Sequence, residues 1–245
     1  MTSAAAPQTP AVRVGVVTFP GSLDDRDALR AVATMGAEPV PIWHADESLS
    51  GVDAVILPGG FSYGDHLRAG AIARFAPVMD AVRAFAGGGG PVLGICNGFQ
   101  ILCEAGLLPG ALIRNRSLAF VCRWVYLRTE EPTGSFADWV DGEVIQIPIK
   151  HGEGQFVAAE EDLDLLEANG QVILRYCSPA GEVLDAFNPN GAARGIAGIR
   201  NERGNVIGMM PHPEHAVDPD LGPTGGHAVF GWLLGRARAR THAVA

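Results

Sequence analysis

The sequence predicts an α/β protein with a mostly parallel sheet flanked by helices. Short apolar, β-branched segments alternate with helical patterns through the first half of the chain, and brief Gly- and Pro-containing loops join them. Such alternation is typical of a parallel sheet that helices cover on both faces. The 245 residues have 47% apolar content, which is enough to build one sizeable core. We therefore expect a single large domain.

The first half of the chain contains the parallel strands. Each predicted strand is a buried apolar run that ends at Gly, Pro or another turn residue. The strand patterns cover residues 12–19, 39–43, 52–57 and 91–95. Helical spacing of apolar residues predicts helices over 24–35, 67–85 and 97–104.

The second half predicts further strands joined by turns, without regular helices between them. These strand patterns cover residues 119–128, 143–149, 171–177, 195–200 and 205–210, and a helix over 225–240 ends the chain. We interpret this half as a β-rich insertion within one domain, residues 12–242. Residues 1–11 are small, polar and Pro-containing, which indicates a flexible N-terminal tail.

Composition narrows the partners and the compartment. The net charge of −9 argues against nucleic acid or an anionic membrane as the main partner, since both attract clustered Lys and Arg. No apolar run approaches the ~20 residues that span a bilayer, and residues 1–10 show neither the basic nor the apolar region of a signal peptide, so we expect none. The four cysteines form no CxxC pair, so we expect no metal site and reduced thiols in the cytoplasm.

One cysteine lies where a predicted strand turns into a helix. Cys96 stands at the centre of a Gly-x-Cys-x-Gly segment, residues 94–98. Small residues on both sides permit a sharp turn that presents the thiol at the top of the sheet, as in the nucleophile elbow of Gly-x-Ser-x-Gly hydrolases. The helix dipole also favours the reactive thiolate. The alternative is an ordinary buried cysteine, and the strand–turn–helix context favours a nucleophile.

A candidate base follows another predicted strand end. Pro211 and Pro213 stiffen the backbone on both sides of His212, and Glu214 is close enough in sequence to accept a hydrogen bond from the ring N–H. A lone histidine after a strand is more often structural. Combined with an elbow cysteine, the His-x-Glu turn indicates a general base and the carboxylate that orients it.

An acyl-transfer site also needs N–H donors for the oxyanion. The elbow offers the N–H of Asn97, and the Gly59-Gly60 turn is placed to bring a second donor close, although alone it reads as a plain loop. Because ligands of parallel sheets bind beyond the carboxyl ends of the strands, the strand ends at Pro20-Gly21, Pro58-Gly59-Gly60 and Cys96 are expected to converge on one pocket. The glycine run 87–90 lacks the Lys-Ser/Thr of a phosphate loop, and no dinucleotide fingerprint opens the first helix, so no cofactor is predicted.

Eight segments in collinear order carry a resemblance to a known family. They cover residues 19–22, 57–65, 94–100, 107–110, 114–117, 151–154, 188–191 and 208–214. On these segments the chain resembles class I glutamine amidotransferases and, among them, the glutaminase subunits of phosphoribosylformylglycinamidine synthase. The stretches Gly-Gly-Phe-Ser-Tyr-Gly-Asp and Gly-Met-Met-Pro-His-Pro-Glu are highly specific.

The resemblance implies a flavodoxin-like amidotransferase fold and hydrolysis of glutamine to glutamate and ammonia for purine biosynthesis. It assigns Cys96 as the nucleophile, His212 as the proton carrier and Glu214 as its orienter. It further implies two protein partners: a large synthetase subunit, which uses ATP and Mg²⁺ and receives the ammonia, and a small bridging subunit. This chain itself is expected to hold no cofactor.

The resemblance also assigns substrate contacts and exposes departures. It implies that Gly60 and Asn97 supply oxyanion N–H groups and that Gln100 lies in the glutamine-binding region. The sequence differs from the family's usual pattern at three places. It has Leu23-Asp24 in place of Asn-Cys, Gln155 in place of Asn or Arg, and His215 in place of Arg. None removes a triad member, so they concern docking more than the thiol chemistry.

Two alternatives remain open at this point. A stand-alone cysteine hydrolase or peptidase of the related flavodoxin-like class would share the elbow, but it would carry a histidine beside the nucleophile, where Asn97 stands. A non-catalytic binding module would keep the fold and would not need an intact set of Cys96, His212 and Glu214.

Overall fold

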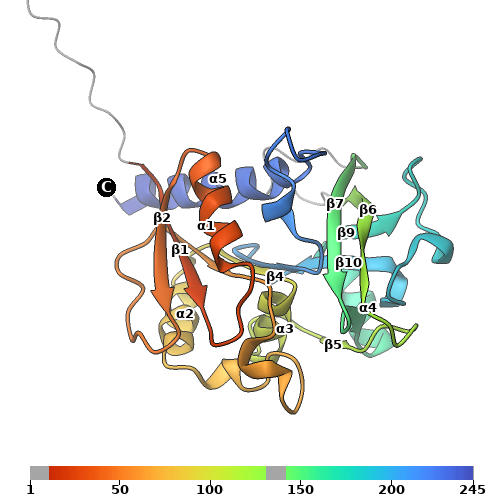
Figure 1. Ribbon diagram of the computed structural model, residues 1–245, viewed down its shortest axis with the longest axis horizontal. Coiled ribbons are helices and arrows are strands. Elements are labelled where there is room, and N and C mark those ends of the chain that lie inside the picture. Colours follow the sequence, from red (N-terminus) through yellow and green to blue (C-terminus); the bar gives the residue numbers. More distant parts are fainter. Residues whose placement is uncertain (1–10, 131–141, 245) are drawn as a thin grey trace, which may run out of the picture.

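Nine strands of the described chain form one sheet, and helices cover both faces of its parallel half (Figure 1). The computed structural model describes residues 11–130 and 142–244. The predicted tail lies outside these residues apart from Ala11, and so does the side chain of His242. Among the described helices, none is long and apolar enough to cross a membrane.

The sheet has a parallel half and an antiparallel half. In spatial order its strands are β2 (Glu38–Trp43), β1 (Arg13–Thr18), β3 (Ala54–Leu57), β4 (Val92–Ile95), β11 (Val206–Met209), β10 (Ile196–Arg200), β9 (Val172–Cys177), β6 (Val121–Thr129) and β7 (Val144–His151). The first five run parallel, and every later neighbouring pair is antiparallel. A second, two-stranded sheet pairs β5 (Ala111–Ile113) with β8 (Gln155–Val157).

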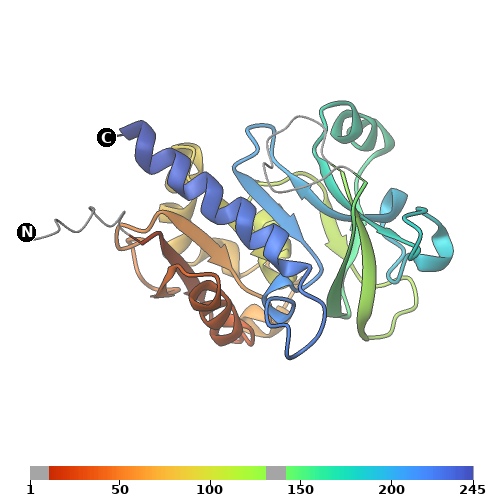
Figure 2. The same cartoon turned by 90° about the horizontal axis from the view of Figure 1, so that it is seen from above.

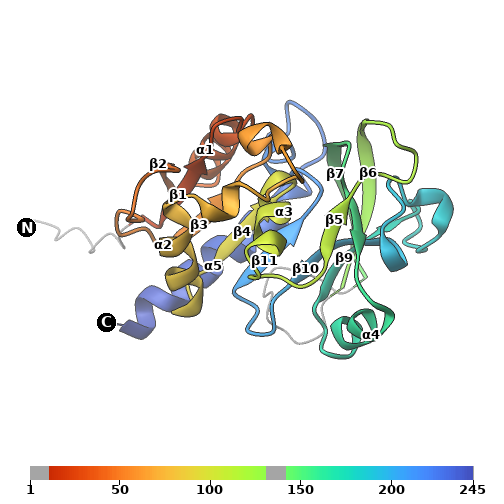
Figure 3. The same ribbon diagram turned by 90° about the horizontal axis from the view of Figure 1, so that it is seen from below.

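Helices sandwich the parallel half, as the sequence predicts. Helices α1 (Asp25–Thr34) and α5 (Gly226–Val244) lie on one face, and α2 (Val78–Gly87) and α3 (Asn97–Glu104) lie on the other (Figures 2 and 3). All residues of β3, β4 and β11 are buried, which explains why these strands read as continuous apolar runs. The α/β class and the parallel core are therefore confirmed.

Helix α3 packs unusually close to the sheet, and glycine makes this possible. A Cβ built on Gly98 would lie 1.9 Å from the carbonyl oxygen of Leu57 in β3. At Gly94 a Cβ would lie 2.8 Å from the backbone of Gly98. The two glycines of the elbow thus let α3 start directly against β3 and β4, which fixes the position of the residue between them.

Two helix predictions were wrong. The helix predicted over 67–85 is only α2, which begins after Pro77, because proline lacks the N–H that a continuing helix needs. The preceding segment contains Gly70 at φ +80° and a short 3₁₀ turn, Ala73–Phe75. In the second half, helix α4 (Glu160–Ala168) lies between β8 and β9, where no helix was predicted. Only Leu163 and Leu166 of α4 are buried, so its apolar signal is weak.

Candidate active site

A cavity of about 390 Å³ lies beyond the carboxyl ends of the parallel strands. Its wall includes four of the predicted site residues, Gly60, Cys96, Gln100 and His212. The other three, Gly59, Asn97 and Glu214, do not line the cavity. The expected convergence of strand ends is therefore confirmed for Gly60 and Cys96, whereas Pro20 and Gly21 do not line the cavity. The cavity has the volume of a small-molecule site.

The elbow at Cys96 has a strained backbone. Cys96 follows β4 directly, precedes α3, and adopts φ 50° and ψ −104°. Its N–H donates to the carbonyl oxygen of Met209 in β11 at 2.8 Å, and its side chain is buried at the cavity wall. A left-handed φ at a non-glycine residue costs ~1–3 kcal/mol and persists where the surrounding structure enforces it. This geometry matches a nucleophile elbow.

The histidine turn is tied to the neighbouring antiparallel strand. His212 precedes a 3₁₀ turn, Pro213–His215, and its N–H donates to the carbonyl oxygen of Pro148 in β7 at 2.8 Å. Its Nδ1 lies 2.7 Å from Oε1 of Glu214, which is fully buried. Within the described residues, the buried Nε2 of His212 has no hydrogen-bond partner. The ring is thus oriented through Nδ1, while Nε2 on its other side is left without a partner.

The charge on His212 follows from its neighbours. Burial works against a charged ring, yet the negative charges of Glu214 and Cys96, and the hydrogen bond with Glu214, raise the pKa of His212 to about 10. The imidazolium form of His212 is therefore favoured. A charged imidazole near a cysteine stabilises the thiolate, which is the reactive form of a cysteine nucleophile.

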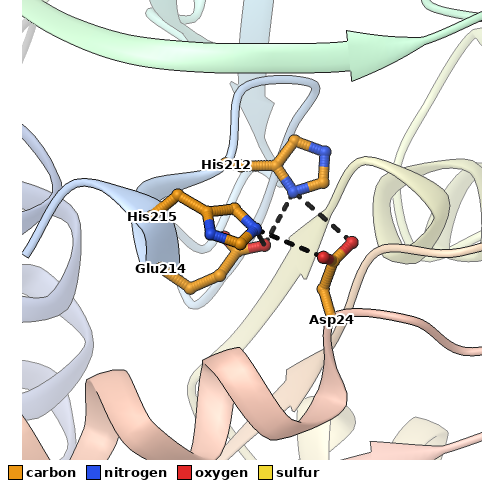
Figure 4. Close-up of side chains that lie close together, drawn as sticks. All are labelled: Asp24, His212, Glu214 and His215. Atoms are coloured by element: carbon orange, nitrogen blue, oxygen red, sulfur yellow. Dashed lines mark hydrogen bonds and ion pairs between the residues drawn. The ribbon is translucent and has the colours of Figure 1, made fainter. Parts of the chain in front are cut away.

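A buried carboxylate that was not predicted as a site residue lies beside His212 and Glu214. Asp24 follows β1 and contacts the ammonium of Lys150 through Oδ1, which also lies 3.2 Å from Nε2 of His215 (Figure 4). Its Oδ2 lies 3.7 Å from Nδ1 of His212. Burial raises the pKa of Asp24, but the bonds to His215 and Lys150 and the charge of His212 hold it below its usual range.

Two departures from the family pattern therefore meet in space. Asp24 and His215 are 191 positions apart in the chain and contact each other directly. The third departure, Gln155, begins β8 and pairs with Ile113, away from the cavity wall. We infer that the first two substitutions form one local unit.

The same residues present a ligand-type atom set. One atom each from Asp24, His212, Glu214 and His215 lies within 4.8 Å of the others. However, Lys150 occupies one oxygen of Asp24, and Nδ1 of His212 bonds to Glu214. These pairings favour a hydrogen-bonded charge cluster, and we assign no metal to it.

Both predicted oxyanion positions lie at tight backbone turns. Gly60 has φ +146°, and a Cβ there would lie 2.7 Å from the carbonyl oxygen of Gly21. Asn97 is the first residue of α3, so its N–H belongs to the group that a helix start leaves without an intrahelical partner. The side chain of Asn97 accepts from the N–H of Ser62 and donates to Gln100. It therefore braces the turn and does not face substrate.

Gln100 links the elbow helix to a second wall of the cavity. Its Nε2 donates to the carbonyl oxygen of Glu153 at 2.6 Å. The turn of residues 151–154 is also held by buried Asn115, whose Oδ1 accepts from Gly154 and contacts Nδ1 of His151. Burial first, and then the charge of His212, lowers the pKa of His151 to about 4. His151 is accordingly a neutral wall residue.

The cavity mouth carries opposite charges. Asp65 and Glu153 both line it, and burial together with the charge of Glu153 raises the pKa of Asp65 to about 6, against the hydrogen bond from Asn97. Arg114 lies 3.6 Å from Glu153 and is largely exposed. Two close carboxylates favour a bound cation, and the exposed guanidinium of Arg114 favours an anion.

Sequence reasoning missed Asp24, Lys150 and Asp65 as site residues. Asp24 and Asp65 follow the carboxyl ends of β1 and β3, which is the position that marks ligand sites in parallel sheets. Lys150 lies at the end of an antiparallel strand, so no such rule applies to it. The remaining histidines are accounted for: His44 bonds to Tyr63, His227 lies 2.8 Å from the carbonyl oxygen of Val217, and His66 is exposed.

Comparisons with known proteins agree with this geometry. Residues 11–224 match the CobB/CobQ-like glutamine amidotransferase domain. The phosphoribosylformylglycinamidine synthase subunit PurQ of Frankia casuarinae is 60% identical over 212 residues, 86% of this chain and 88% of that protein. The same subunit of Nitrobacter winogradskyi is 55% identical over 91% of this chain and 97% of that protein.

The fold comparison gives the same result. A chain in the structure of PurLQS from Thermotoga maritima is 41% identical and superposes with a TM-score of 0.81. The match covers 92% of this chain and 99% of that chain. Together these findings decide against the peptidase and the non-catalytic alternatives. The chain belongs to the CobB/CobQ-like glutamine amidotransferases and, among them, to the PurQ family of phosphoribosylformylglycinamidine synthase subunits.

Proposed function

We propose that this protein hydrolyses glutamine with Cys96, His212 and Glu214 as its catalytic triad. The observation that carries the proposal is that Cys96 and His212 line one cavity, with the free Nε2 of His212 on the side away from Glu214. The thiolate attacks the side-chain amide carbon of glutamine and forms a tetrahedral oxyanion. His212 then protonates the departing nitrogen, and ammonia leaves a glutamyl thioester on Cys96.

The second half of the reaction regenerates the thiol. His212, now neutral, accepts a proton from water, and the hydroxide attacks the thioester carbon. Cys96 departs as thiolate and glutamate is released, while Glu214 keeps the ring in one orientation. The N–H groups of Gly60 and Asn97 stabilise the oxyanion in both steps.

Glutamine fits the charges at the cavity mouth. Its α-ammonium group would lie between Asp65 and Glu153, where two carboxylates repel each other without a cation. Its α-carboxylate would bind Arg114, whose guanidinium is exposed and close to Glu153. Gln100 supports this pocket through its bond to the backbone of Glu153. The amide end then points toward Cys96.

The ammonia is delivered to a partner in a complex like that of the Thermotoga maritima PurLQS structure. We propose a large synthetase subunit, which uses ATP and Mg²⁺, and a small bridging subunit. Around the cavity four apolar side chains are exposed, and they are Leu23, Phe61, Leu118 and Phe120. Exposed apolar rims of this kind mark protein interfaces. The synthetase subunit would cover this rim and keep ammonia from water.

The antiparallel half has a role in the same site. We propose that β6, β7 and β9 form the β-rich insertion, since they extend the parallel core and contribute Lys150 and His151 to the cavity wall. The four cysteines are all free thiols in the structure, which suits a reducing compartment such as the cytoplasm.

The test is ammonia release from glutamine, with and without the synthetase subunit, by the wild type and by Cys96→Ala. The variant is expected to lose at least about 10³-fold in kcat, because no other group replaces the covalent step. Cys103→Ala is a matched control, since this thiol lies at the far end of α3 and outside the cavity. Wild-type hydrolysis by the Cys96→Ala protein would disprove the mechanism.

A further inference from the structure

His212 is flanked by two carboxylates, although a triad needs one. Glu214 lies 2.7 Å from Nδ1 and Asp24 lies 3.7 Å from the same nitrogen. Figure 4 shows both contacts reaching that ring atom from different sides. Asp24 belongs to the β1–α1 connection, so a distant part of the chain brings the second negative charge to the ring.

The backbone is built to permit this approach. Gly59 lies between the two side chains, and a Cβ there would come within 2.5 Å of Oδ2 of Asp24 and 2.7 Å of Cε1 of His212. The carbonyl oxygen of Gly59 accepts hydrogen bonds from the N–H groups of Leu23 and Asp24, both at 3.2 Å. The same glycine therefore holds Asp24 in place and leaves room for its carboxylate beside the imidazole.

Lys150 supplies a counter-charge for the buried carboxylate of Asp24. Its side chain is only 4% exposed, and its other oxygen is bound to Lys150, the only lysine in the chain. An unpaired carboxylate at this depth would be costly, whereas a paired one is tolerated. Lys150 therefore lets the charge of Asp24 persist and partly cancels its field at His212.

The groups that face His212 come from every element around it. On its own turn they are Glu214 and His215, and from other elements they are Asp24, Cys96, Lys150 and His151. Of these, Asp24 and Lys150 form a direct ion pair, and His215 also contacts Asp24. Removal of Asp24 leaves the positive charge of Lys150 near the ring, and removal of Lys150 leaves the negative charge of Asp24 there.

We propose that Asp24 is a positioning residue, a second carboxylate that favours the charged form of His212, and that Lys150 is the counter-charge that limits its effect. The inference rests on the proposed function, in which Cys96 and His212 are the reacting pair. It concerns these two residues specifically and predicts opposite effects from their removal.

The experiment follows the ring of His212 directly by ¹⁵N NMR of histidine-labelled full-length protein, with the signal assigned by its absence in His212→Asn. Asp24→Asn is expected to lower the pKa of His212 by about one pH unit, since a neighbouring opposite charge is worth ~1–3. Lys150→Gln is expected to raise it, because Asp24 then acts uncompensated. The basic limb of the kcat/KM profile for glutamine should move in the same two directions.

The control is Asp27→Asn. It removes the same charge from helix α1, but Asp27 pairs with Arg30 on the surface at 3.4 Å, so His212 should not respond. Shifts of the same sign in both variants, or no shift in either, would overturn the proposal, since a purely structural role cannot produce opposite shifts. Lys150→Gln stands alone as a test if Asp24→Asn does not fold. Because the NMR reading needs no catalysis, loss of the proposed glutaminase function would appear separately, in the Cys96→Ala assay.

Discussion

Substitution of Gly98 by alanine tests whether the close packing of α3 positions the nucleophile. The added Cβ would lie 1.9 Å from the carbonyl oxygen of Leu57, which is 1.5 Å short of an ordinary 3.4 Å contact. Gly98 and Leu57 are both buried, in α3 and β3, so neither residue can move without its helix or strand. The helix must shift by more than about 1 Å, and Cys96 at its first turn moves with it.

The size of the effect follows from this displacement. Overpacking of a core costs ~1–3 kcal/mol and more when backbone must move, so we expect a loss of about 3 kcal/mol in the free energy of unfolding. For a chain of 245 residues this lowers Tm by ~6–12 °C. A misplacement of about 1 Å at the reacting atom costs ~10²-fold in kcat/KM.

The measurement is urea unfolding together with glutamine hydrolysis. Gly235→Ala is the matched control, because Gly235 lies in the exposed interior of α5 and a Cβ added there would meet no atom within 4 Å, so alanine should stabilise the helix by ~1 kcal/mol. Equal stability of Gly98→Ala and wild type would refute the packing argument. Lost stability with unchanged kcat/KM would refute its link to Cys96.

Three further changes test the electrostatics of the site. Glu214→Gln should lower kcat by ~10³–10⁴ with little change in KM, because the ring of His212 loses its tautomer and its charge partner; steady-state kinetics measure both. The pKa of His151 is about 4 in the folded protein and ~6.5 in the unfolded chain, so the unfolded chain binds the proton first as the pH falls. The free energy of unfolding of the wild type should therefore decrease by ~3 kcal/mol between pH 6.5 and pH 4. Urea unfolding should show a smaller decrease for His151→Gln. Asp65→Asn should stabilise the protein by ~1 kcal/mol above pH 6, where the carboxylate is charged, and should have no such effect below pH 4. The same substitution should raise KM for glutamine.

Each of these has a contradicting outcome. Unchanged kcat in Glu214→Gln would remove that residue from the triad. Parallel stability curves for wild type and His151→Gln would mean that His151 is not held neutral. A lower KM in Asp65→Asn would contradict its contact with the α-ammonium group.

The parallel core and the proposed triad could both be named from the sequence because both depend on local signals. Buried parallel strands are continuous apolar runs, and the elbow at Cys96 is defined by the small residues beside it. Helix α4 was missed because its two buried leucines barely distinguish it from a polar loop. The helix predicted over 67–85 was started too early, on the N-terminal side of Pro77, because apolar spacing outweighed the proline in that prediction.

The rest of the site depends on contacts between distant segments. Asp24 and Lys150 are 126 positions apart and meet only because β7 lies across the cavity from the β1–α1 connection. No local pattern around Lys150 distinguishes it from a surface lysine. The departures at Asp24 and His215 were visible in the sequence, but their contact was not, since it is set by how α1 packs against the histidine turn.

The solitary lysine has a practical consequence for work with this protein. Apart from the N-terminal amine, Lys150 is the only primary amine in the chain, and it lies in the wall of the active-site cavity. Reagents that acylate amines, whether for fluorescent tagging, surface immobilisation or chemical cross-linking, therefore have one internal target, and modification there would separate Asp24 from its counter-ion.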